Sequence, residues 1–143
     1  MSMRLDPMGT LTVHIDESWS FPDGPLGGRS CSAFTGVVWE SPQLTARSVW
    51  ANGTYQLGDP VAQVHVRVLL RDDDGVLLFL DYLARTDMPA HVAGRAPVIM
   101  SGRFEAPESV ERYAWLNRTQ VVGMGRLDME AKTQTYDMYA LGW

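Results

Sequence analysis

Residues 61–71 form the most regular strand-like stretch of this chain. Apolar and polar side chains alternate along it, which is typical of a β-strand with one face against a core. A turn of three aspartates and a glycine follows at residues 72–75, and residues 75–85 return as a nearly continuous apolar strand. The pair predicts an antiparallel hairpin. The two faces of the first strand are Val64, Val66, Val68 and Leu70, and Gln63, His65, Arg67 and Leu69.

The rest of the sequence predicts further short strands separated by turns. Residues 20–30 and 86–96 contain glycine and proline and are expected to be loops. Asn52 and Gly53 predict a hairpin turn. Residues 1–8 are expected to be a loosely ordered leader. The further strands are expected at residues 9–18, 31–39, 43–52, 97–105, 119–128 and 132–141.

About eight strands joined by short turns indicate an all-β protein. Successive hairpins form an antiparallel meander, and closure into a barrel removes its exposed edges. We therefore expect a single β-barrel domain over residues 1–143, with one short helix near residues 108–118. Pro107 ends the strand before that helix, and Tyr113 and Leu116 give it an apolar face that could plug one end of the barrel.

The composition excludes several classes of function. The net charge of −5 argues against a nucleic-acid partner, which normally needs a basic patch. No run approaches the roughly 20 apolar residues of a membrane-spanning helix, so we expect no membrane partner. The single Cys31 rules out an internal disulfide and a cysteine-rich zinc site, and it favours a reducing, cytoplasmic setting.

The sequence contains no strong cofactor or metal motif. It lacks a phosphate-binding loop, a dinucleotide fingerprint, a nucleophile elbow and a paired-histidine zinc helix. The three histidines have no ligand spacing, and we expect His14 on the solvated face of its strand and His91 on a loop. We therefore expect no cofactor and no metal.

The candidate catalytic residues are His65, Arg67 and Tyr82. His65 and Arg67 are two residues apart, so they project from the same face of the sheet. A histidine can move a proton near neutral pH, and an arginine can hold a carboxylate or enolate through two hydrogen bonds. The alternation alone leaves open whether this face lines a lumen or faces water. Tyr82 shares its face with apolar neighbours and is expected to place a hydroxyl in the lumen.

Five further residues are candidates for contacts with a substrate. Trp50 and Trp115 could line a pocket or pack for area alone. Asp137 could contact the substrate, or it could pair with a strand arginine such as Arg126 or Arg103. The five candidates are Trp50, Arg103, Trp115, Asp137 and Tyr139.

Three segments near the C-terminus carry a resemblance to a known family. RFEAPESVERYAWLNR at residues 103–118, VVGMGR at 121–126 and YDMYAL at 136–141 resemble the signature of domain-of-unknown-function family 3237 (DUF3237), also called uncharacterised protein family 0311. Looser matches lie upstream, at residues 27–30, 36–44 and 73–75. The resemblance implies a small antiparallel barrel, similar in outline to allene oxide cyclases, with a lumen for a small ligand. A few members resemble lyases, cyclases or decarboxylases of aromatic or polyketide metabolites.

The same resemblance favours the lumen for His65 and Arg67, because Arg67 falls where the family has an arginine that we take to face inward. The chain also departs from the family pattern. Val49 stands where the family tends to have an aspartate, and His65 where it tends to have an acid. The carboxylate that would pair with Arg67 in the family pattern is therefore missing from this chain.

The leading hypothesis is a cofactor-free lyase, isomerase or cyclase that acts by proton transfer on a small aromatic or polyketide-like carbonyl or carboxylate compound in the lumen. His65 would be the acid or base, Arg67 would bind the anionic group, and Tyr82 would donate to the developing oxyanion. The alternatives are a non-catalytic binding protein for a small hydrophobic metabolite, and a structural or assembly protein. We expect a homo-oligomer.

Overall fold

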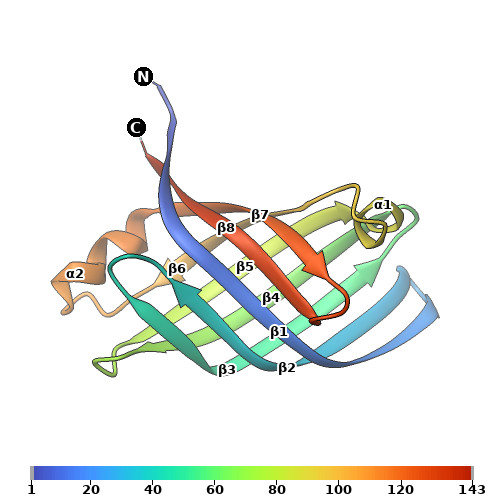
Figure 1. The fold of residues 1–143 in the computed structure, drawn as a ribbon, viewed down its shortest axis with the longest axis horizontal. Helices are drawn as coiled ribbons and strands as arrows, with labels where there is room; N and C mark the ends of the chain where they lie inside the picture. Colours follow the sequence, from blue (N-terminus) through green and yellow to red (C-terminus); the bar gives the residue numbers. More distant parts are fainter. Residues whose placement is uncertain (1, 143) are drawn as a thin grey trace.

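Eight antiparallel strands form one closed barrel, in which each strand pairs with the next along the chain and β8 pairs with β1 (Figure 1). The computed structural model describes residues 2–142. The predicted all-β barrel is therefore confirmed. The strands are β1 (Arg4–Gly24), β2 (Gly27–Glu40), β3 (Thr45–Leu57), β4 (Val61–Asp72), β5 (Leu77–Asp87), β6 (Val98–Glu105), β7 (Gln120–Asp128) and β8 (Thr133–Gly142).

The first and last strands close the barrel. Arg4 pairs with Gly142, and the register continues to His14 and Thr133 with one shift between Pro7 and Gly9. The expectation of a loosely ordered leader is therefore wrong from Arg4 onward, since backbone hydrogen bonds to β8 order this segment. The start of β1 and the end of β8 therefore lie side by side (Figure 1).

Two predicted turns are instead parts of strands. Residues 20–30 extend the hairpin of β1 and β2, which turns only between Gly24 and Gly27. Asn52 and Gly53 lie inside β3, where they pair with β4. The ring of Phe34 fills the place that a side chain at Gly53 would take, so packing, not a turn, requires this glycine.

Short helices cover the two ends of the barrel (Figure 1). The predicted helix near residues 108–118 is present as α2 (Glu111–Ala114) followed by the 3₁₀ turn η1 (Trp115–Arg118). The segment expected to be a loop at 86–96 contains a second helix, α1 (Met88–Val92). Asp87 caps α1 by accepting a hydrogen bond from the backbone N–H of Ala90, with Pro in the first turn. Among residues 2–142, no helix is long and apolar enough to cross a membrane.

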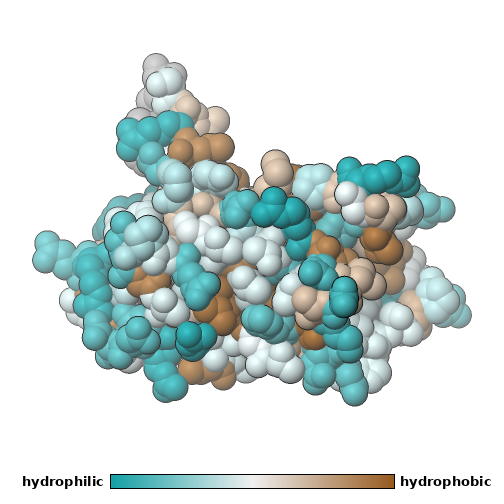
Figure 2. Space-filling view, in the orientation of Figure 1, coloured by the Kyte–Doolittle hydropathy of each residue, from teal (hydrophilic) through white to brown (hydrophobic). Residues whose placement is uncertain are grey.

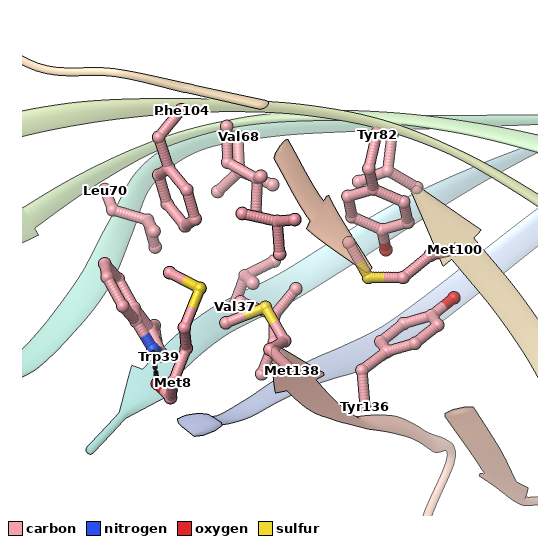
Figure 3. Close-up of a cluster of buried hydrophobic side chains, with 14 of the residues drawn as sticks. Met8, Val37, Trp39, Val68, Leu70, Tyr82, Met100, Phe104, Tyr136 and Met138 are labelled. Atoms are coloured by element: carbon pink, nitrogen blue, oxygen red, sulfur yellow. Dashed lines mark hydrogen bonds between the residues drawn. The ribbon is translucent and has the colours of Figure 1, made fainter. Parts of the chain in front are cut away.

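The core lies inside the barrel and follows the alternation of β4. The aliphatic residues at even positions of β4 are buried, while Gln63 and Arg67 are exposed. Inward side chains from every strand fill one end of the barrel, as expected for eight strands. Figure 3 shows Trp39 and Phe104 at one end of this cluster and Tyr82 and Tyr136 at the other. Outside, hydrophilic and hydrophobic residues are interspersed on the face in Figure 2.

Hydrogen bonds to Asp72, at the end of β4, hold helix α2 against the barrel. Its side chain is only 4% exposed. Its Oδ2 accepts hydrogen bonds from the Tyr113 hydroxyl at 2.7 Å and from Arg112 at 3.1 Å, and its Oδ1 accepts from the backbone N–H groups of Asp74 and Val76. Burial alone would raise the pKa of Asp72, but these four hydrogen bonds outweigh it, and the pKa is lowered.

Candidate functional site: the barrel lumen at the α1 end

A cavity of about 360 Å³ occupies the barrel at the end covered by α1. This volume is within the range of small-molecule sites, roughly 300–1,000 Å³. Most of its wall is apolar, with Val13, Phe34, Val64 and Val66 among the lining residues. Polar groups also line it, and three charged residues, all exposed, lie at its rim: Asp16, Asp128 and Lys132.

Two buried phenols face each other across this end of the core. The rings of Tyr82 and Tyr136 lie 5.4 Å apart in an edge-to-face arrangement, and both residues line the cavity (Figure 3). Burial raises the pKa of Tyr82 well above its usual value, and neighbouring Tyr136 raises it further. Burial also raises the pKa of Tyr136. Both hydroxyls therefore stay protonated at neutral pH and can donate hydrogen bonds.

A third phenol completes this set. Tyr55 of β3 lines the same cavity, and burial raises its pKa, opposed in part by a hydrogen bond with Ser32. The lumen thus combines apolar walls with neutral phenols from β3, β5 and β8. The prediction that Tyr82 points inward is confirmed, because it belongs to the buried face of β5.

His91 lies in the lumen wall, and not on a flexible loop as the sequence had suggested. Helix α1 buries it to 6% exposure. Its Nδ1 lies 2.9 Å from the carbonyl oxygen of Ala96, and its Nε2 lies 3.3 Å from Oε1 of Gln134. Helix α1 brings His91 over the end of the barrel. The sequence did not predict this helix, because five residues are too few to show a helical pattern of apolar side chains.

Gln134 is the second polar residue that sequence reasoning missed. It projects inward from β8 beside Tyr136 and lines the cavity. The glycine at position 125 of β7 leaves room for both, since a Cβ there would lie 2.6 Å from Nε2 of Gln134 and from the Tyr136 ring. The alternation of β8 could have identified Gln134 as inward-facing, because Tyr136 and Met138 share its face.

The expectation that His65 and Arg67 face the lumen is wrong. They project from the outer face of β4, because its aliphatic residues fill the interior. Nε2 of His65 lies 2.7 Å from Oδ1 of Asp81, and Arg103 lies 3.8 Å from the same carboxylate. Arg67 is directly opposite Asp81 in the register with β5. These residues form a partly solvated cluster on the outside of the barrel.

None of the five expected substrate contacts lines the lumen cavity. Trp50 is 47% exposed on the outside. Arg103 belongs to the outer cluster with Asp81, and Asp137 pairs with Arg126 at 3.5 Å, one of the two arginines expected. Tyr139 shares the outer face of β8 with Asp137. Trp115 lines a second cavity of about 470 Å³ at the α2 end.

We expect replacement of His65 by alanine to leave ligand binding in the lumen within twofold of wild type and the free energy of unfolding within about 1 kcal/mol. The side chain lies outside the barrel, and a partly exposed ion pair contributes roughly 0–1 kcal/mol to the stability. Calorimetric titration with a ligand of the lumen measures the first effect, and thermal unfolding measures the second. A large loss of binding with an unchanged melting temperature would show that His65 belongs to the functional site.

No group of three or more histidine, cysteine, aspartate or glutamate side chains in residues 2–142 is arranged to hold a metal ion. Apart from the charged residues at the rim, the polar groups that line the lumen are hydrogen-bond donors and acceptors: three phenols, one imidazole, one amide and the hydroxyls of Ser18, Ser30, Ser32 and Thr86.

A family model described as "Protein of unknown function (DUF3237)" matches residues 3–141. The chain belongs to this family. The DUF3237 chain is also similar to solved structures. A β-barrel-like protein from Acinetobacter baumannii is 24% identical, with a TM-score of 0.81 over 99% of this chain and 98% of that one. A conserved protein of unknown function from Rhodopseudomonas palustris is 14% identical, with a TM-score of 0.84 and 99% coverage of both chains.

A structure described as an enzyme from Penicillium herquei is also similar to this DUF3237 chain. It is 13% identical, and the TM-score is 0.74 over 99% of this chain and 96% of that one. These likenesses extend over whole chains and support the barrel fold. No curated protein matches the sequence.

Proposed function

We propose that the lumen is the active site of a cofactor-free enzyme that moves a proton in a small aromatic or polyketide-like carbonyl compound. The observation that carries this proposal is the pair of protonated phenols, Tyr82 and Tyr136, buried in a cavity whose wall is mostly apolar. Similarity to a fungal enzyme supports the choice of an enzyme, at the level of the fold alone.

The phenols hold the oxygen on which negative charge develops. When a proton leaves the carbon next to a carbonyl group, its electron pair moves into a new carbon–carbon double bond and the oxygen becomes an enolate. Donors fixed in an apolar, water-poor site stabilise this oxygen more strongly than water does. Tyr82 and Tyr136 are suited to this role because both hydroxyls are protonated at neutral pH and both residues are buried in the lumen.

Asp16 is the proposed acceptor of the proton. It lines the same cavity at the rim, where its side chain is exposed. A carboxylate that can reach the bound compound can take the proton from the carbon and return it to a different one, which is isomerisation. In a longer compound folded by the apolar walls, the enolate carbon would bond to a second carbonyl carbon of the same compound, and the oxygen of that carbonyl would take the electron pair and then a proton, which closes a ring.

A second candidate function is the binding of a hydrophobic carbonyl compound without turnover. The observation that favours it is that the three charged residues lining the cavity are exposed at its rim, while the buried polar residues of the wall are Tyr82, Thr86, His91, Gln134 and Tyr136. In this case the phenols would hold the carbonyl oxygen of a stored compound.

Native mass spectrometry of protein from its own host, before and after denaturation, identifies any retained compound and the subunit number. Turnover is then followed in D₂O as deuterium uptake beside the carbonyl group of that compound and of simple aryl ketones. We expect catalysed uptake in the wild type and its loss in Asp16→Asn. The control is Asp23→Asn, since Asp23 is exposed on the same strand and is not among the residues that line the cavity, and uptake should be unaffected. A retained compound without any catalysed uptake would support the binding protein instead.

A further inference from the structure

An apolar strip crosses the outside of the barrel, where an antiparallel sheet normally presents polar side chains to water. Trp50, Leu69 and Phe79 are directly opposite one another in the registers of β3, β4 and β5. They belong to the outer face, because the alternate positions of β4 and β5 are the fully buried ones. Trp50 is 47% exposed, and the other two are half-buried. We call these three residues the outer strip.

A β-bulge in β3 adds exposed apolar surface at one end of the outer strip. The register with β4 shifts between Ser48 and Trp50, so Val49 is an extra residue in β3. Val49 is 45% exposed beside Trp50. Bulges of this kind re-aim side chains and are common near functional surfaces. The covering of this end of the strip by a partner would remove two large apolar side chains from water.

Arginines flank the outer strip on both sides. Two residues along β4 in one direction, Arg71 is directly opposite Arg47 of β3. Two residues in the other direction, Arg67 is followed around the barrel by Asp81 and then Arg103. All four arginines are exposed. The strip is therefore an apolar surface between two rows of positive charge.

The charges of this face are opposite in sign to those of the whole chain. The rows that cross β3 to β6 here contain four arginines and two acids, Asp81 and Glu105, so the face has a net charge of +2 on a chain of −5. Arg47 and Arg71 also place like charges directly opposite each other, which destabilises a pair of strands. Acidic groups of a partner would turn this repulsion into attraction.

The same charges determine what kind of partner fits. Two copies of this chain do not pair favourably through this face about a twofold axis, because arginine rows would then face arginine rows. A nucleic acid would use the arginines and could stack on Trp50, but the aliphatic Val49 and Leu69 offer its bases no stacking surface. A protein segment with both acidic and apolar side chains matches every part of the face.

We propose that the outer strip is the docking site of an acidic, amphipathic helix of another protein. Trp50 and Phe79 are two strand spacings apart, about 10 Å, which is the length of two helical turns. Arg67 and Arg71 are four residues apart, or about 13 Å along β4. A helix of about 10–12 Å diameter lies between them, with its apolar side on the strip and an acidic flank towards each arginine row.

Fluorescence anisotropy with a labelled helical peptide of about 15 residues tests this proposal. The peptide has leucines at positions i, i+4, i+7 and i+11 and glutamates on both flanks, and in a matched neutral peptide glutamines replace the glutamates. We expect the acidic peptide to bind at least about tenfold more tightly than the neutral one, and its affinity to fall as salt is added. Equal affinity for the two peptides, or binding of neither, would overturn the proposal. Tighter binding of a single-stranded oligouridine would instead assign the strip to nucleic acid.

Variants of the protein locate the peptide on the strip. Trp50→Ala should weaken binding of the acidic peptide by about tenfold or more, as truncation of a central aromatic contact does, while Trp19→Ala, at an equally exposed tryptophan of β1, should change it less than about twofold. Wild-type affinity in Trp50→Ala would show that the peptide binds elsewhere.

Charge reversal at Arg71 separates a binding role from a structural one. Arg71→Glu should weaken binding by about fivefold, yet melt at or above the wild-type temperature, because it places opposite charges opposite each other across β3 and β4. Arg126→Glu, on the outer face of β7, is the control and should bind the peptide as wild type does. Unchanged affinity in Arg71→Glu, or a lower melting temperature together with weaker binding, would contradict the proposed role of this arginine row.

Discussion

Phenylalanine in place of Tyr82 or Tyr136 is expected to lower the rate of catalysed deuterium uptake by about 10²- to 10³-fold, the usual effect of removing one donor to a developing oxyanion. The phenyl ring keeps the edge-to-face packing between the two side chains, which lie 5.4 Å apart, so the fold should be retained. The loss should fall mainly on kcat, because the donor acts most strongly on the enolate and less on the ketone.

The matched control is Tyr139→Phe, which removes a hydroxyl from the outer face of β8 and should leave the rate unchanged. Far-UV circular dichroism and thermal unfolding verify that each variant is folded. If both Tyr82→Phe and Tyr136→Phe retain the wild-type rate, the phenols do not hold the reacting oxygen, and the proposed mechanism is wrong.

Alanine in place of Asp72 is expected to reduce the free energy of unfolding by about 3–5 kcal/mol, because each buried donor left without its acceptor costs roughly 1–3 kcal/mol. The substitution leaves the Tyr113 hydroxyl and two backbone N–H groups without their acceptor. Since a domain of this size is stable by roughly 5–15 kcal/mol, this is a large fraction of the total. Urea unfolding measures it, and exposed Asp73→Ala is the control, with an expected change within about 0.5 kcal/mol.

The contribution of Asp72 should also depend on pH. Its pKa is lowered in the folded state, so its stabilisation is fully present above the unfolded pKa of about 3.9 and is lost as the pH falls through the folded value. The difference in unfolding free energy between wild type and Asp72→Asn should therefore be constant from neutral pH to about 5 and shrink below about 4. A difference that grows on acidification would contradict the lowered pKa.

The barrel could be predicted from sequence because its strands alternate over long stretches. The same alternation could not decide which face of β4 was inside. His65 and Arg67 were placed inward through the family resemblance, but four aliphatic side chains on the opposite face gain more from burial than two polar ones. An eight-stranded barrel has little interior space, so its apolar faces fill it first.

The parts of the site that sequence could not predict depend on contacts between distant segments. His91 is in the lumen because α1 folds over the barrel end, where the ring meets Gln134, 43 residues away. Asn52 and Gly53 have the composition of a turn, but Phe34 from the neighbouring strand packs over Gly53. Local propensity contains no information on either contact, because tertiary packing decides both.

The pairing of β1 with β8 has a consequence for biosynthesis. β1 bonds to β2 through residues 10–24 and to β8 through residues 4–14. As the chain leaves the ribosome, the edge of β1 that later pairs with β8 has no partner until residues 133–142 have emerged. Such unpaired edges can recruit strands from other molecules, and contacts between distant segments form slowly. The seam between β1 and β8 is thus the place where a nascent chain is most exposed to aggregation, and where a chaperone would offer the most protection.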